Sequence, residues 1–247
     1  MQLYVAPLAC SAATRIALYE AGGTAEFVYV DIHTNPRVRV LPDGADYFAV
    51  NPMGQVPALR TAAGEILTEN PVVLQYVADS YPEAQLAPRS GIERYRLQQW
   101  LNFIATELHK ATFIPLLDRS SPDGAKAFAR QKLPVRFGHL DGHLAGRAFL
   151  LNAFSVADAY LVTVLNWAPY AGVDLAEWPR VNAYFRTLSQ RPAVARALAE
   201  EADAFAAEQG RRRALRRGQP TRELQSAIPL GEARSEECRS LAPLGSQ

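Results

Sequence analysis

The chain has 247 residues, of which 49% are hydrophobic and 21% are charged, and its formal net charge is +1. This is enough apolar material for the packed core of one large or two small domains. The charge is uneven, because residues 211–247 hold eight Arg against four Glu, so the main body offers no basic field of the kind that nucleic-acid-binding proteins present.

The first eighty residues alternate predicted strands and helices. Two short apolar runs, 3–6 and 26–32, predict strands on either side of a helix from Ser11 to about Gly22. Serine is a residue type that caps helices, and glycine commonly ends them. A strand, a helix and a strand in so short a span form a βαβ unit, which predicts parallel pairing of the two strands.

A hairpin and a second helix follow. The stretches "QVPALRT" and "EILTE" predict two strands joined by a short turn. Val56 and Pro57 open the first of them, where a proline is tolerated. Helical periodicity resumes over 70–81. We therefore expect a small α/β domain over residues 1–81.

The rest of the chain is predicted to be helical. The Pro-rich stretch 80–91 has the composition of a linker, and a helical bundle domain is expected over residues 88–208. Its helices are predicted around Leu97 to Leu108 and near 123–145, 155–171, 177–190 and 192–208. Periodicity then fails, and residues 209–247 are predicted to be a disordered tail, either a dispensable extension or an arm attracted to anions or membranes.

The cysteines and the apolar runs indicate the compartment. Cys10 and Cys238 stand near opposite ends, and Ala13 occupies the position at which a CxxC pair would have its second thiol. So few cysteines favour a reducing compartment. The N-terminus has no basic stretch followed by an apolar run, and the longest uncharged run, 159–173, is too short to cross a bilayer. We expect a cytoplasmic protein with no membrane or nucleic-acid partner.

Cys10 lies directly before the first predicted helix. The N–H groups and the dipole of a helix N-terminus favour an anion, and a thiol placed there acquires a lowered pKa and becomes a competent nucleophile. A lone cysteine is equally consistent with a buried structural residue. Position alone leaves both alternatives open.

Two polar stretches of the α/β domain have the pattern of a ligand site. In "NPMGQVPAL", the Val56-Pro57 bond opens a strand after a turn and is a candidate cis bond that would leave Val56 able to pair with an extended peptide. In "LTENPVVLQY", Glu69 and Asn70 stand at a strand-to-helix junction with Pro71 behind them. An ordinary trans strand start and plain helix capping are the competing interpretations.

The helical domain contributes a third stretch, "WLNFIATELHK". Asn102, Thr106 and His109 follow i, i+4, i+7 spacing and are expected on one helix face, either lining a cleft or simply solvated. Ser155 and Asp158 are expected to form a structural capping box. His139 and His143 have no evident third ligand, so no metal site is expected.

Together these stretches resemble the cytosolic glutathione transferases, specifically the bacterial beta class. The resemblance extends over residues 1 to about 205 through "ACS", "DYFAVNPMGQVPAL", "LTENPVVLQYVAD", "WLNFIATELHK" and "FSVADAY". It implies a thioredoxin-like N-terminal domain, an all-α helical-bundle C-terminal domain, and a homodimer that binds glutathione as co-substrate. The implied reaction is conjugation of glutathione to small hydrophobic electrophiles in detoxification. Thiol-disulfide exchange through Cys10 is a second activity, and a non-catalytic binding protein is the alternative class.

The resemblance also implies the site. Cys10 would face the glutathione sulfur with His109 near it, and Val56 before cis-Pro57 would pair with the tripeptide backbone. The residues expected to complete the glutathione pocket are Glu69, Asn70, Asn102, Thr106, Glu107 and Leu108. The family often has serine at Asn70 and lysine at Met53, and the lysine for the glycine end has no clean match, so Arg39 or Arg37 is the expected substitute. Tyr170 occupies a position near the second-substrate pocket where relatives often have histidine.

Overall fold

The computed structural model describes residues 1–35 and 38–216. Its N-terminal part contains a four-stranded sheet with the order β2-β1-β5-β6. The strands are β1 (Gln2–Val5), β2 (Glu26–Tyr29), β5 (Ala58–Arg60) and β6 (Ile66–Leu67), and the flanking helices are α1 (Ala12–Glu20) and α2 (Asn70–Ser80). β1 pairs in parallel with β2, as the βαβ prediction requires, whereas β5 is antiparallel to both β1 and β6. The thioredoxin-like arrangement is confirmed.

The segment between β2 and β5 differs from the prediction. The sequence suggested one strand over 26–32, but β2 ends at Tyr29 and a separate strand, β3 (Asp31–Asn35), pairs with β4 (Val38–Val40). A short helix, η1 (Tyr47–Ala49), follows, and the Asp46 side chain caps it by accepting the Phe48 N–H. Charged and polar residues dilute the strand signal here, which is why periodicity did not resolve these elements.

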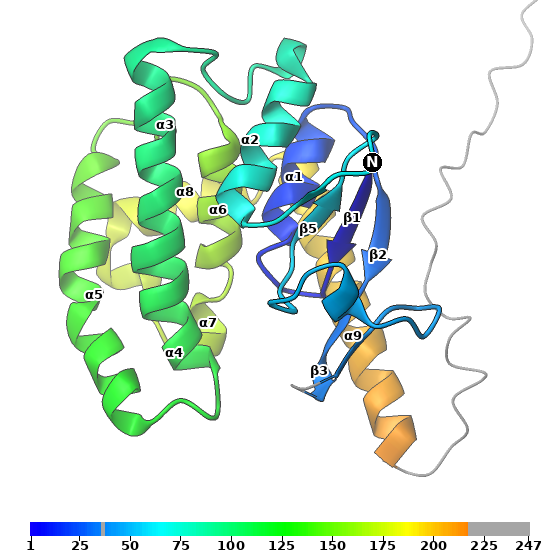
Figure 1. Ribbon diagram of the computed structural model, residues 1–247. Helices are drawn as coiled ribbons and strands as arrows, with labels where there is room; N and C mark the ends of the chain where they lie inside the picture. Colours follow the sequence, from blue (N-terminus) through cyan, green and yellow to red (C-terminus); the bar gives the residue numbers. More distant parts are fainter. Residues whose placement is uncertain (36–37, 217–247) are drawn as a thin grey trace, which may run out of the picture.

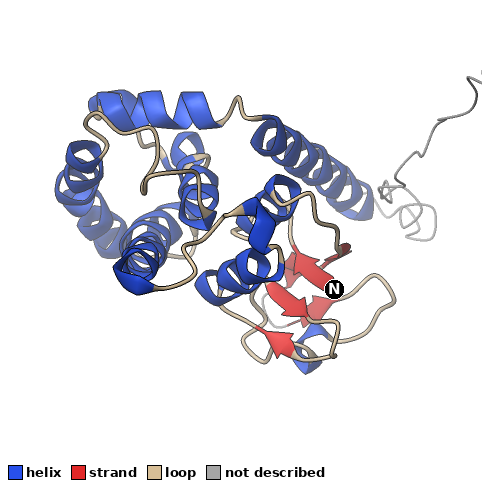
Figure 2. Ribbon diagram, turned by 90° about the horizontal axis from the view of Figure 1, so that it is seen from above, coloured by secondary structure: helices blue, strands red, loops and turns tan. Residues whose placement is uncertain are grey.

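The remaining described elements are helical (Figures 1 and 2). After the turn η2 (Pro82–Ala84) they are α3 (Gly91–Phe103), the π-helical η3 (Ile104–Phe113), α4 (Ile114–Leu117), α5 (Asp123–His143), α6 (Val156–Leu165), α7 (Ala168–Ala171), η4 (Leu175–Glu177), α8 (Pro179–Leu188) and α9 (Pro192–Arg216). All ten residues of α6 are buried, so this helix forms the centre of the bundle. No helix among the described residues is long and apolar enough to cross a membrane.

The two parts share one large core. Helix α1 packs against α6 and α9, and α9 passes behind the sheet in Figure 1. A buried ionic network supports this contact, in which Arg15 Nε lies 3.0 Å from Glu201 Oε1 and Arg15 Nη1 lies 2.9 Å from Glu200 Oε2. The helical domain is thereby fixed against the face of the sheet that α1 covers.

Helix α9 extends beyond the segment in which periodicity predicted it. It continues to Arg216, so residues 209–216 of the expected tail are helical. Arg212 pairs with Glu208 one turn earlier and lies 3.9 Å from Asp31 of β3. These ion pairs stabilise a helical turn that has little apolar patterning. The rest of the expected tail, 217–247, including Cys238, lies outside the described residues.

Candidate active site

Cys10 follows β1 and precedes Ser11, the N-cap position of α1. The residue is 9% exposed, and its thiol donates to the Val56 carbonyl at 3.1 Å. Burial raises the pKa of Cys10 to about 12, although Lys110 acts to lower it. This shift is opposite to the one that a helix N-terminus favours, because desolvation of a buried thiolate outweighs the nearby helix terminus. The Ser11 hydroxyl contacts the Ala6 backbone and does not cap the helix.

The loop that leads into Cys10 is held from the helical domain. Leu8 has a positive φ of 56°; its N–H donates to Glu201 Oε2 at 2.8 Å, and its carbonyl accepts from Trp167 Nε1 at 2.9 Å. Glu201 is fully buried and also binds Arg15. A left-handed leucine is held by partners far away in the sequence, so no local pattern could have identified them.

Val56 and Pro57 are joined by a cis peptide bond, as predicted. The loop before them is fixed by the Gln55 carbonyl, which accepts from Tyr47 Oη at 2.8 Å and from Asn51 Nδ2 at 2.7 Å. The Gln55 side chain accepts from Lys110 Nζ at 3.2 Å. Lys110 therefore connects the helical domain to the cis-proline loop beside Cys10.

Glu69 and Asn70 begin α2 but play different parts. Glu69 is exposed, with a φ of 65°, a backbone conformation that non-glycine residues seldom adopt outside functional sites. Asn70 is buried; it accepts from Thr14 Oγ1 at 3.2 Å, and its Nδ2 donates to the Cys10 carbonyl at 3.2 Å. Neither side chain caps the helix. Asn70 thus ties the start of α2 to the Cys10 loop.

The expected polar face at the end of α3 is divided. Asn102 and Thr106 are exposed and donate back to the carbonyls of Gln98 and Asn102, whereas His109 is buried, with Nδ1 2.6 Å from Tyr160 Oη. The i, i+4, i+7 argument assumed one continuous α-helix, but the chain becomes π-helical at Ile104, so Thr106 and His109 do not continue the α-helical face of Asn102.

The neighbours of His109 also lie in different places. The Glu107 carboxylate is 2.9 Å from Arg136 Nε of α5, and Leu108 is fully buried in the core. Arg39 donates from Nε to the Gly54 carbonyl at 3.3 Å, next to the cis-proline loop. Arg37, its expected alternative, lies outside the described residues.

His109 is neutral in the folded protein. Burial, and to a lesser degree Lys110, lowers the pKa of His109 to about 3. Burial, and then proximity to Cys10, raises the pKa of Tyr160, so its hydroxyl stays protonated. Tyr160 was not identified as a site residue from the sequence, because its stretch has the pattern of an ordinary capped helix.

The pKa of His109 predicts acid sensitivity. Because the folded pKa lies below the ordinary value of 6.5, the unfolded chain takes up the proton first as pH falls. The contribution of His109 to stability is therefore complete above pH 6.5 and is lost as the pH falls from 6.5 toward 3. At pH 4 the loss amounts to about 3 kcal/mol. Chemical denaturation at pH 7, 6, 5 and 4 should show His109→Gln losing less stability on acidification than the wild type.

A matched control for this prediction is His139→Gln, since His139 is exposed on α5. This variant should retain the acid sensitivity of the wild type. Equal pH dependence of the His109→Gln variant and the wild type would contradict a neutral, buried His109.

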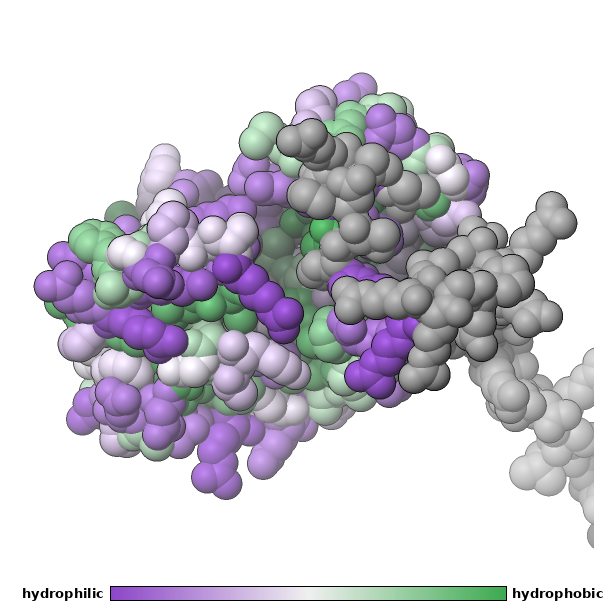
Figure 3. Space-filling model, turned by 90° about the horizontal axis from the view of Figure 1, so that it is seen from below, coloured by the Kyte–Doolittle hydropathy of each residue, from purple (hydrophilic) through white to green (hydrophobic). Residues whose placement is uncertain are grey.

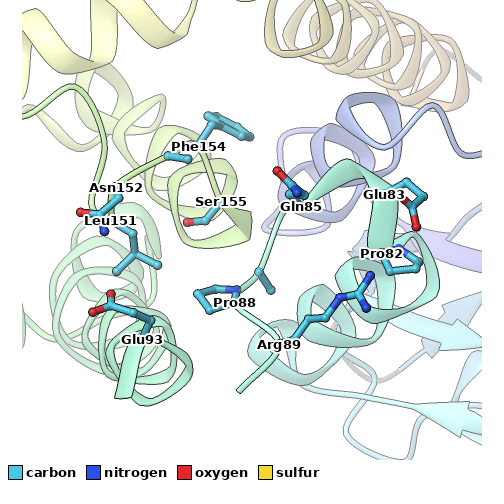
Figure 4. Close-up of a pocket in the computed structure, with 12 residues that line it drawn as sticks. Pro82, Glu83, Gln85, Pro88, Arg89, Glu93, Leu151, Asn152, Phe154 and Ser155 are labelled. Carbon is cyan, nitrogen blue, oxygen red and sulfur yellow. The ribbon is translucent and has the colours of Figure 1, made fainter. Parts of the chain in front are cut away.

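Two cavities on the helical side of the molecule are lined by other residues than these. A cavity of about 420 Å³ lies between the linker and the loop before α6, lined among others by Pro88, Arg89 and Asn152 (Figure 4). It contains none of the predicted site residues. Among the described residues, no group of three or more His, Cys, Asp or Glu is arranged to hold a metal ion.

Comparison with known proteins identifies the family. Residues 9–80 match the N-terminal domain model of glutathione S-transferase, and residues 103–192 match its C-terminal domain model. The chain is 41% identical over 203 residues to glutathione S-transferase GstA of Escherichia coli O157:H7, which covers 81% of this chain and 98% of that protein.

Solved structures agree with the sequence matches. A sphingomonad glutathione S-transferase complexed with glutathione is 46% identical, with a TM-score of 0.76 over 82% of this chain and 99% of that one. A bacterial beta class glutathione S-transferase from Sphingomonas chungbukensis is 43% identical, with a TM-score of 0.75 over 81% of this chain and 98% of that one. The two domain models match in the same order as the N-terminal and helical parts of the structure, and the chain belongs to the glutathione S-transferase family.

Proposed function

We propose that the chain conjugates glutathione to small hydrophobic electrophiles, RX + GSH → R–SG + HX, at the site formed by Cys10 and the cis-proline loop. The observation that carries this proposal is the junction at Cys10: its thiol reaches the Val56 carbonyl at 3.1 Å, and its own carbonyl accepts from Asn70 at 3.2 Å. Cys10, which would face the glutathione sulfur, thus contacts both the Val56 segment and the Asn70 segment, which would bind the tripeptide.

The protonation of Cys10 suggests its role. A thiol with a pKa of about 12 is an S–H donor at neutral pH. Such a donor suits stabilisation of a glutathione thiolate, which is the nucleophile of the conjugation. We propose that Cys10 donates to the glutathione sulfur and that Val56, Glu69 and Asn70 bind the tripeptide. Asn102, Thr106, Glu107, Leu108 and Arg39 stay predicted pocket residues.

The electrophile would bind over this sulfur. Seen from below, hydrophobic residues gather in a recess between the helical and the N-terminal parts (Figure 3). Ile114 of α4 and Tyr170 of α7 are exposed large side chains on two helices that contact each other. An apolar site with a few polar groups is the usual environment of a small hydrophobic ligand.

A second activity is thiol-disulfide exchange. In the first step the Cys10 sulfur attacks a mixed disulfide R–S–SG at the glutathione sulfur, its proton passes to the departing RS⁻, and Cys10–S–SG and RSH form. A second glutathione thiolate then attacks Cys10–S–SG at the glutathione sulfur, which yields GSSG, and the released Cys10 sulfur takes up a proton. The unpaired thiol at Cys10 favours this two-step route, because no second cysteine is present among residues 1–35 and 38–216 to resolve the mixed disulfide.

We also propose a cytoplasmic homodimer. Val72 of α2 and Ile92 and Tyr95 of α3 are large apolar residues exposed on neighbouring helices, which is typical of a surface that a partner covers. Light scattering of the purified chain tests this; Tyr95→Asp should shift a dimer toward monomer, and a wild type that is monomeric at micromolar concentration contradicts it.

Steady-state kinetics test the enzymatic proposals. The wild type is assayed with glutathione and chlorodinitrobenzene, and separately with a glutathione mixed disulfide. Turnover of chlorodinitrobenzene above the uncatalysed rate supports conjugation. Retention on immobilised glutathione without turnover of either substrate would instead favour the non-catalytic binding protein.

A further inference from the structure

The π-helical segment η3 ends where Pro115 interrupts the helix. In an α-helix the carbonyl of Ala111 would accept the N–H of residue 115, but proline has no N–H and its ring presses on the carbonyl four residues earlier. The Ala111 carbonyl therefore has no partner in an α-helical register. A helix that continues across this point must either bend or widen.

The structure shows a widened helix. The Ile114 N–H bonds the His109 carbonyl, five residues earlier, and the Thr112 hydroxyl donates to the Glu107 carbonyl at 2.7 Å, also five residues earlier. Such i→i+5 bonding is uncommon and frequently occurs at functional sites. Here the widened turns contain both His109 and Lys110.

Arg136 of α5 occupies the place of the missing donor. Its Nη1 donates to the Ala111 carbonyl and to Thr112 Oγ1, both at 3.1 Å, and its Nε lies 2.9 Å from Glu107 Oε2. The side chain is 11% exposed. A planar guanidinium can satisfy several acceptors at once in a fixed geometry, which a lysine cannot do.

We propose that Arg136 is a positioning residue of the active site, because it holds η3 in the π-helical register that directs His109 to Tyr160 and Lys110 to Gln55. The expected fall in conjugation rate rests on the proposed function. The expected displacement of His109 and Lys110 does not. Return of this segment to an α-helical register would rotate side chains by roughly 100°, the angle between neighbouring residues of an α-helix. His109 would then leave Tyr160, and Lys110 would leave the cis-proline loop.

The experiment compares variants of the full chain. Arg136→Gln removes the three contacts, and Arg136→Lys keeps the charge beside Glu107. Arg130→Gln is the matched control, because Arg130 also lies on α5 and donates to two carbonyls outside η3, that of Ala171 at the end of α7 and that of its C-cap residue Gly172. The double variant Arg136→Gln/Pro115→Ala returns an N–H to the helix.

Two readouts separate positioning from stability. We expect kcat/KM for glutathione conjugation to fall by about tenfold to a hundredfold in Arg136→Gln, as for misplaced catalytic groups, and by less in Arg136→Lys. Arg130→Gln should stay within about twofold of the wild type. The NMR chemical shifts of the His109 ring nitrogens should move away from the values of a hydrogen-bonded imidazole in Arg136→Gln and should keep those values in Arg130→Gln. All samples are measured where circular dichroism shows them folded.

The double variant tests whether Arg136 only satisfies a carbonyl. We expect Pro115→Ala to restore thermal stability to Arg136→Gln without restoring the kinetics or the His109 signals. Recovery of thermal stability, kinetics and His109 signals together in the double variant overturns the positioning role. An unchanged His109 spectrum in Arg136→Gln also overturns it. If the wild type shows no conjugation, the proposed function is contradicted. If the His109 signals nevertheless shift in Arg136→Gln, the positioning role is still supported.

Discussion

Replacing Asp158 by alanine is expected to lower the free energy of unfolding by about 3–5 kcal/mol, because each buried donor left unsatisfied costs about 1–3 kcal/mol. Asp158 is fully buried and accepts the Leu150 N–H, the Ser155 N–H and hydroxyl, and the Tyr184 hydroxyl at 2.6–2.8 Å. Its removal leaves several donors without an acceptor in the core. Urea denaturation at pH 7 measures the loss.

Two controls show whether the effect belongs to the carboxylate. Ser155→Ala removes one partner of the capping box and should lose about 1 kcal/mol, and Tyr184→Phe should lose about as much. A loss below about 1 kcal/mol for Asp158→Ala itself contradicts the network. The network matters for the site because it fixes the start of α6, the helix that carries Tyr160.

Replacing Cys10 by alanine is expected to abolish disulfide exchange while conjugation partly survives. Only a thiol at this position can form the mixed disulfide with glutathione, so exchange should fall to the uncatalysed rate. In conjugation the attacking sulfur belongs to glutathione. Loss of one S–H donor, worth roughly 1 kcal/mol, should lower kcat/KM by less than about tenfold. Parallel assays with a mixed disulfide and with chlorodinitrobenzene measure the two rates.

Cys10→Ser is the matched variant for this prediction. A serine hydroxyl keeps a donor at the same place, so its conjugation rate should exceed that of Cys10→Ala while its exchange activity stays at background. Equal loss of both activities in Cys10→Ala would indicate that one thiol-based mechanism serves both reactions.

Much of the fold could be predicted because its signals are local. The βαβ unit, the hairpin, the helix from Asn70 and the Ser155–Asp158 capping box each depend on residues within a few positions of one another, and the structure contains all of them. The strands β3 and β4 were missed because charged and polar residues dilute their short apolar pattern. Helix α9 extends eight residues beyond its predicted end, where the ion pairs of Arg212 take the place of apolar periodicity.

The chemistry of the site could be predicted less well. The sequence places Cys10 beside a helix terminus, and that position suggested a lowered pKa, whereas burial raises it. It also suggested that Asn102 and Thr106 share a face with His109, but the π-helical register separates them. The degree of burial decides the first case and the helical register the second, and both depend on what the rest of the chain packs against that point.

The sequence by itself determined most of the order of the elements, because capping, turn and helix-start preferences operate over a few neighbouring residues. Local pattern left the Val56-Pro57 bond and the roles of Cys10 and His109 open, and it was the family resemblance that implied a cis bond and a site there. Only the tertiary structure decided which groups meet: Glu201 and Trp167 at Leu8, Tyr160 at His109, and Arg136 at Ala111. These partners stand 25 to 193 residues apart in the chain. Contacts over such separations arise from packing of the whole core, and no periodicity encodes them.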